Sequence, residues 1–221
     1  MAPLLILLKF LPLGFSALLP LINPVGSALV LLGMVGPQPV GVYRELAAKI
    51  ARNTVLLLIA VDLVGTLVLR FFGLSLPVVQ LAGGGVVAAI GWKLLNRAED
   101  ASEDARAAST VPMVAGATFY PLTFPVTAGP GCIVVMLTLS AHASQRAWGD
   151  TLMAHLGLWL GILSVGALVY FAYASAPRLA NRISPQTTQG IVRIIAFILL
   201  CIGVQIAWNG VENLVRPLLH R

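Results

Sequence analysis

The chain has 221 residues, of which 58% are hydrophobic and 10% charged, and its formal net charge is +6. Soluble domains are roughly a quarter charged, so a water-soluble fold is excluded and a bilayer must act as the solvent. Because the Lys and Arg residues lie mostly at the ends of apolar runs, without a basic stripe interleaved with aromatics, we expect membrane lipid and no nucleic acid as partners.

The apolar runs predict an all-α integral membrane fold with six transmembrane helices. Each crossing needs roughly 20 apolar residues. In chain order the runs are Leu4–Val35, Arg52–Phe72, Pro77–Leu95, Val111–Ala141, Thr151–Ala174 and Ile191–Val211. The first and fourth are too long for one straight crossing and contain prolines near the middle, which remove a backbone donor and clash with the preceding turn. We therefore expect each to form two half-helices joined by an unwound stretch.

The two broken helices begin two similar halves of the chain. The prediction is a single membrane domain, 1–221, made of repeat 1, a polar loop and repeat 2 at 1–96, 97–110 and 111–221. At an offset of 105 residues, Pro20 aligns with Pro125 and Gly26 aligns with Gly131. Because each half has an odd number of spans, the second must enter the membrane in the opposite orientation. The sequence thus predicts two inverted three-helix repeats with helices 1 and 4 broken.

The basic residues predict the orientation in the membrane. An outside N-terminus puts nine basic residues in the cytoplasm and five outside, which the positive-inside rule favours. The cytoplasmic set is Arg44, Lys49, Arg52, Lys93, Arg97, Arg106, Arg178, Arg182 and Arg193. The N-terminal run has no basic segment before it and no cleavage site. We expect it to be retained as the first helix, with both termini outside.

The residues at the two breaks form the predicted solute site. A half-helix that begins at mid-membrane presents unpaired N–H groups and the positive end of its dipole, and the half-helix before it presents unpaired carbonyls. Such groups are tolerated where they line a cavity or bind a ligand, and a zwitterion matches both ends. Glycine in these stretches would let a ligand approach the backbone. The predicted solute-binding residues are Asn23, Pro24, Gly26, Ser27, Thr127, Gly129, Pro130, Gly131, Gln205 and Asn209.

A structural alternative exists for each part of this site. The prolines could merely kink packed helices, with Asn23, Ser27 and Thr127 hydrogen-bonding the freed backbone. Gln205 and Asn209 are four apart on one helix and also suit hydrogen bonds between helices. Close helix packing is the preferred interpretation of the glycines, which are Gly157, Gly161, Gly83, Gly84, Gly85, Gly91, Gly203 and Gly210.

One carboxylate, Asp62, stands inside an otherwise apolar run at 56–69. An intramembrane carboxylate is a functional-site hypothesis by default, and we predict that Asp62 couples solute movement to an ion, a proton or sodium. The alternative is a structural Asp62 that holds helices together, either protonated or paired with an arginine such as Arg193. His155, in the fifth span, is expected to be a satisfied buried histidine.

Catalysis and metal binding find no support in the sequence. Cys132 and Cys201 lie in apolar runs and the histidines are scattered, so we expect no disulfide, metal or cofactor. There is no H-E-x-x-H, no G-x-S-x-G and no intramembrane Ser/His pair at a recognisable spacing. We therefore expect a protein that is not an enzyme.

Four parts of the chain stand out as motifs around the breaks and the glycines. They are Leu19-Pro-Leu-Ile-Asn-Pro-Val25, Phe72-Gly-Leu-Ser75 with Leu81-Ala-Gly-Gly84, Pro125-Val-Thr-Ala-Gly-Pro-Gly131, and Cys201-Ile-Gly-Val-Gln205 with Asn209-Gly210. In these motifs the sequence resembles the MarC family of bacterial inner-membrane proteins. The resemblance implies six helices in the cytoplasmic membrane, and some relatives are regarded as transporters of small neutral amino acids such as glycine and alanine. Asp62 lies outside these segments. We expect a secondary transporter of small neutral zwitterions; the alternative is a non-transporting membrane scaffold or regulatory protein.

Overall fold

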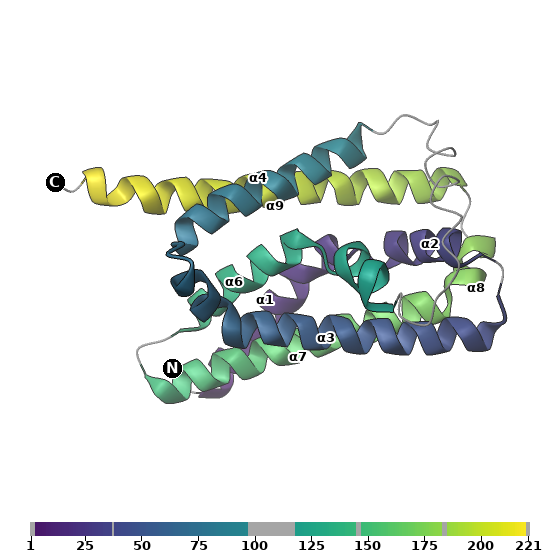
Figure 1. Ribbon diagram of the computed structural model, residues 1–221, viewed down its shortest axis with the longest axis horizontal. Coiled ribbons are helices and arrows are strands. Elements are labelled where there is room, and N and C mark those ends of the chain that lie inside the picture. Colours follow the sequence, from purple (N-terminus) through teal and green to yellow (C-terminus); the bar gives the residue numbers. More distant parts are fainter. Residues whose placement is uncertain (1–2, 37, 97–117, 145–146, 183–184, 220–221) are drawn as a thin grey trace.

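The computed structural model describes residues 3–36, 38–96, 118–144, 147–182 and 185–219, which are helical apart from short connections (Figure 1). The elements are α1 (Pro3–Ile22), α2 (Pro24–Val35), α3 (Val40–Phe71), α4 (Leu76–Leu95), η1 (Thr118–Thr127), α6 (Pro130–Ala143), α7 (Trp148–Ala174), α8 (Ala176–Arg182) and α9 (Pro185–Leu219). Five spans are long and apolar enough to cross a membrane, and the bent pair of η1 and α6 makes six. The all-α membrane fold is confirmed for this part of the chain. The predicted loop at 97–110 and the start of the fourth span lie outside the described residues.

α3 is much longer than its apolar run. α3 begins at Val40, twelve residues before the predicted start at Arg52. Its first turns carry exposed charges, including an ion pair of 2.7 Å between Lys49 Nζ and Glu45 Oε1. At 1.5 Å per residue, a helix of 32 residues is about 48 Å long, which exceeds the hydrocarbon thickness of about 30 Å. Hydropathy finds only the membrane-embedded part of such a helix, because the helix continues into polar residues.

α4 and α9 lie side by side along one face of the other helices (Figure 1). Their backbones touch at glycines. A Cβ at Gly91 would lie 2.5 Å from the Leu200 nitrogen, and one at Gly210 would lie 2.6 Å from the Pro77 carbonyl oxygen. Small residues permit such approaches between membrane helices. The predicted packing role is confirmed for these glycines, whereas Gly85 faces open space.

The remaining helices pack against each other on one side of the α4–α9 pair, and among them α7 contacts α1, α2, α3 and α6. Gly157 and Gly161 lie against α1, so that a Cβ on either glycine would come within 2.8 Å of a carbonyl oxygen of Leu7 or Leu11. The small-xxx-small prediction for α7 is therefore confirmed. The first turn of α1 and the last turn of α9 lie at the same end of the molecule (Figure 1).

Candidate functional site

The first break is a single residue. α1 ends at Ile22, α2 begins at Pro24, and Asn23 between them has φ 43° and ψ 66°, in the left-handed region that Asn tolerates. Its Oδ1 accepts a hydrogen bond of 3.1 Å from the Gly26 N–H. The Ser27 hydroxyl donates to the Ile22 carbonyl over 2.7 Å. The predicted interruption is confirmed, but the predicted unwound stretch is wrong here, because these short bonds let the second half-helix restart at once.

The second break is wider. η1 has non-helical backbone at Tyr120 and Phe124, each of which precedes a proline, and a residue before proline is disfavoured in the α region. The axes of η1 and α6 differ by 68°, and α6 restarts at Pro130. The Thr127 hydroxyl lies 2.7 Å from the Leu122 carbonyl oxygen, to which it donates, and 2.7 Å from the Tyr173 hydroxyl on α7. This break is a bent, irregular stretch, as the sequence predicted.

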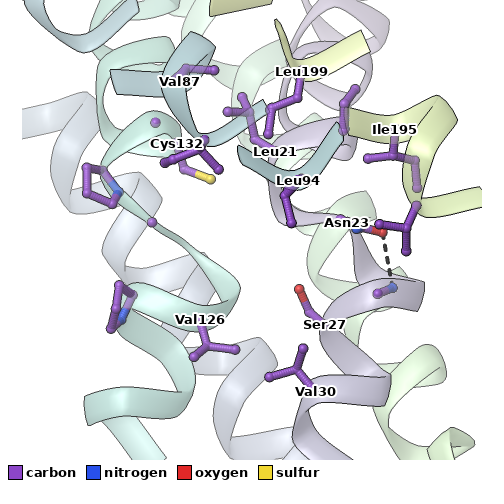
Figure 2. Close-up of a pocket in the computed structure, with 18 residues that line it drawn as sticks. Leu21, Asn23, Ser27, Val30, Val87, Leu94, Val126, Cys132, Ile195 and Leu199 are labelled. Carbon is purple, nitrogen blue, oxygen red and sulfur yellow. Dashed lines mark hydrogen bonds between the residues drawn. The ribbon is translucent and has the colours of Figure 1, made fainter. Parts of the chain in front are cut away.

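A cavity of about 380 Å³ lies between the two breaks and the α4–α9 pair (Figure 2). We call it the break cavity. Its volume falls in the usual range of small-molecule sites, roughly 300–1,000 Å³. In Figure 2, Ser27 and Val30 of α2 lie across from Val126 of η1. Six predicted site residues line it: Asn23, Gly26, Ser27, Gly129, Pro130 and Gly131.

The starts of two helices border the break cavity. Asn23 and Gly129, the residues just before α2 and α6, both line it. The first turn of a helix carries a partial positive charge, which favours an anion. At these two starts Pro24 and Pro130 have no N–H, and the Gly26 N–H already donates to Asn23 Oδ1. Among the described residues that line the cavity, none carries a formal charge. A carboxylate placed here would therefore be compensated by backbone dipoles.

The glycines of this site have a different role from the one expected. A Cβ at Gly131 would lie 2.7 Å from Val87 Cγ2 and 2.9 Å from Leu21 Cδ2, and a Cβ at Gly26 would collide with the Asn23 side chain. The space beside both glycines is thus filled by protein atoms and is not kept open for a ligand. Gly26 allows the Asn23 side chain to fold onto α2, and Gly131 allows α4 to pack against the start of α6.

Four predicted site residues lie outside the lining of the break cavity. Pro24 is buried as the first residue of α2, and Thr127 is buried against Tyr173 of α7. Gln205 Nε2 donates to Asn209 Oδ1 over 2.9 Å within α9. This bond connects two turns of one helix, and Gln205 is exposed, so the structure gives these two residues neither of the roles considered for them.

Sequence reasoning missed the wall that α4 and α9 contribute. Its residues are Val87, Ile90, Leu94, Val192, Ile195 and Leu199. They recur at three- and four-residue intervals, as residues on one helix face do. In helices that are apolar on every side, however, this spacing does not distinguish a cavity-facing stripe from a lipid-facing one.

Asp62 lies away from the break cavity and is bonded to α7. Its Oδ2 lies 2.9 Å from His155 Nδ1 and accepts a bond of 2.7 Å from Trp159 Nε1. Arg193 is exposed on α9, so the suggested Arg193 partner is wrong and His155 takes that place. The Ser140 hydroxyl donates to the Asp62 main-chain carbonyl over 3.0 Å. Because its bond goes to this carbonyl, the cluster does not form a Ser–His–Asp relay.

A model of MarC family integral membrane proteins matches residues 8–215. The chain belongs to the MarC family. Relatives named inner membrane protein MarC (UPF0056) include that of Citrobacter koseri, 27% identical over 215 residues, which covers 95% of this chain and 97% of the relative. The relative from Escherichia coli O157:H7 is 28% identical over 216 residues with the same coverage of both chains. No solved structure is significantly similar. Together with its apolar helices, this membership makes the chain a multi-pass inner membrane protein.

Proposed function

We propose that this MarC family member is a secondary transporter of small neutral zwitterions, amino acids such as glycine, alanine and serine, and not an enzyme. The observation that carries the proposal is the break cavity, where the N-terminal ends of α2 and α6 meet without any charged side chain among the lining residues. Such half-helix ends are the usual means of holding anionic groups of solutes in transporters.

The solute carboxylate would lie at the two helix starts and its ammonium group near the carbonyl ends of the preceding segments. Pro20 and Leu21 before the first break, and Pro125 and Val126 before the second, line the cavity. The Ile22 and Leu122 carbonyls lie outside this lining, and each receives one hydroxyl hydrogen bond, from Ser27 and Thr127. A carbonyl oxygen has two lone pairs and can accept a second donor. The apolar walls from α4 and α9 offer no charged partner to a solute side chain, which favours neutral amino acids over charged ones.

The contacts between helices support two inverted repeats. The third spans of the two halves, α4 and α9, contact each other, as do the second spans, α3 and α7, and the first spans through α1 and α6. A pseudo-two-fold axis that exchanges the two halves is compatible with such a pattern, and the odd number of spans in each half makes it an axis in the membrane plane. We propose that the α4–α9 pair moves as a unit against the other helices and opens the break cavity to alternate sides, with both termini outside.

Counterflow in proteoliposomes tests transport directly. Vesicles preloaded with unlabelled alanine should transiently accumulate labelled glycine, alanine or serine when they contain the protein, and vesicles without protein should not. Preloading with lysine or glutamate should give no accumulation, because the cavity has no side chain to neutralise a net charge. If none of the neutral amino acids accumulates, the proposal fails.

The competing function is a non-transporting scaffold or regulatory protein. Its support is the local satisfaction of the breaks, since Asn23, Ser27 and Thr127 each bond to the backbone of their own segment. A purely structural break needs no ligand. In that case amino acids would neither exchange across the vesicle membrane nor raise the melting temperature of the purified protein.

A further inference from the structure

A second cavity, of about 300 Å³, lies between α3, α6 and α7. We call it the Asp62 cavity. Ser144, Trp148 and Thr151 place it near the end of α6 and the start of α7. The break cavity extends instead toward the ends of α2 and α4 through Val30 and Leu94. These two regions lie at opposite ends of the molecule (Figure 1).

Beside this second cavity, the Asp62 carboxylate is fully buried, with 0% of its side chain exposed. Both of its side-chain partners, His155 Nδ1 and Trp159 Nε1, approach the same oxygen, Oδ2. Oδ1 is buried and has no hydrogen-bond partner. An unpaired buried carboxylate oxygen is a costly arrangement, because it has lost its water and gained no donor.

We propose that Asp62 is a proton-binding site beside the Asp62 cavity, which takes up a proton on Oδ1 when water from the cavity reaches the buried carboxylate. The carboxylate becomes a carboxylic acid as one O–H bond forms on Oδ1 and one O–H bond of a hydronium ion breaks, which leaves a water molecule. The indole N–H is a donor only, so Oδ2 remains an acceptor in both states. His155 and Trp159 thus hold the carboxyl group in place while the charge on it changes. The proton site itself does not depend on the proposed transport function. Only the coupling of this proton to solute movement rests on that function.

Asp62 and His155 are the ionisable side chains among the described residues that line the cavity. Other ionisable groups lie on the helices around it. On α6, His142 bonds the Thr138 carbonyl through Nδ1. On α7, Asp150 lies in the first helical turn, and on α3, Arg70 is exposed near the helix end. η1, which also packs on α3, presents Tyr120 with 68% of its surface exposed.

The described residues argue against a transition-metal ion at this position, because the described His, Cys, Asp and Glu residues form no cluster of three or more that could hold a metal. Sodium takes oxygen ligands instead, and Thr66, Ser140, Ser144 and Thr151 also line the cavity. The sodium measurement below therefore separates a proton from a sodium ion.

The test uses the purified full-length protein without solute. Its four aspartates are Asp62, Asp100, Asp104 and Asp150, and labelling their side-chain carboxyl carbons with 13C lets NMR follow each titration in the unmodified protein. Infrared difference spectra between acid and alkaline pH add the C=O stretch that a carboxylic acid has and a carboxylate lacks. We expect one aspartate signal that changes between acid and alkaline pH, is lost in Asp62→Asn and is kept in Asp150→Asn.

The outcomes separate this inference from the transport function. An Asp62 signal that stays unchanged from acid to alkaline pH overturns the proton site, even if amino acid counterflow is observed. The melting temperature could instead rise with sodium but not with choline, and do so in the wild type but not in Asp62→Asn. That result assigns Asp62 Oδ1 to a metal cation and also overturns the proton site. If Asp62 titrates but no neutral amino acid is exchanged, the proton site stands and the transport function fails.

Discussion

The break cavity and the Asp62 cavity differ in how their polar groups are satisfied. At the two breaks, the side chains of Asn23, Ser27 and Thr127 hydrogen-bond backbone groups three to five residues away. The lining of the break cavity is neutral. At the Asp62 cavity, a buried carboxylate keeps one oxygen without a partner. The first place offers helix dipoles to a visiting solute, and the second offers a single basic oxygen. We infer from this difference that solute and proton bind at separate places in this fold.

The largest expected effect comes from removing the acceptor at the Asp62 cavity. Asp62→Ala leaves the His155 and Trp159 donors without a partner, and each buried unsatisfied donor costs about 1–3 kcal/mol. Asp62→Asn keeps an oxygen at the position of Oδ2. We therefore expect a clear fall in the detergent melting temperature for Asp62→Ala and a much smaller fall for Asp62→Asn. Equal losses in the two variants would show that the bonds to α7 are not what stabilises this region.

A smaller effect is expected at the wall between α4 and α9. Gly91→Leu forces a side chain against the Leu200 nitrogen and the Ala196 carbonyl oxygen, and such overpacking costs about 1–3 kcal/mol. Gly85, which has open space beside it, provides the matched control. Thermal unfolding should distinguish Gly91→Leu from Gly85→Leu. If both variants melt like the wild type, the pair can separate freely and does not move as a unit.

The first break should respond to backbone conformation more than to the lost cap. Asn23→Ala removes the bond to Gly26 and places a Cβ at φ 43°, at a cost of about 1–2 kcal/mol for conformation added to roughly 1 kcal/mol for the cap. Asn23→Gly accepts the conformation, and a glycine at this position costs only a few tenths of a kcal/mol. Melting temperatures should rank wild type, Asn23→Gly, then Asn23→Ala. The reverse order for the two variants would contradict the left-handed break.

The smallest effect is expected from Ser27→Ala. It removes one hydroxyl bond to the Ile22 carbonyl, and side-chain hydrogen bonds inside membrane proteins average about 0.6 kcal/mol. If this carbonyl helps to hold the solute ammonium, solute affinity should change little or rise, because an acceptor is freed. Isothermal titration with alanine measures this. A loss of binding beyond roughly tenfold, about 1.4 kcal/mol, would instead make the hydroxyl a direct ligand.

Sequence reasoning predicted most of the fold because apolar length and proline position act locally. The breaks near Asn23 and Pro130 follow from the proline ring, whatever the helices around them do. Sequence reasoning placed the start of α3 too late, at Arg52, because charged residues continue that helix beyond the membrane. The α4 and α9 walls needed tertiary structure, since Ile90 and Val86 are equally apolar and only one faces the cavity.

The candidate sites were predictable to different degrees for the same reason. Asn23, Ser27 and Gly129 stand out in sequence because they are polar or flexible residues beside prolines, and all three line the break cavity. Asp62 was visible as a lone carboxylate, but its partner was not, because 93 residues separate it from His155. The spacing of His155 and Trp159, four residues apart on one helix face, becomes informative only when α7 is known to pack on α3.

The central claim, that solute binds in the break cavity, is tested most directly by filling that cavity. Ile90 on α4 lines the cavity, whereas Val86, one turn earlier and similarly exposed, does not. Ile90→Trp is therefore the test variant and Val86→Trp its control. Alanine counterflow and the rise in melting temperature on adding alanine should be measured for both variants and for the wild type. We predict that both signals disappear in Ile90→Trp and persist in Val86→Trp. Full counterflow and an unchanged alanine-induced rise in Ile90→Trp would contradict the assignment of this cavity as the solute site.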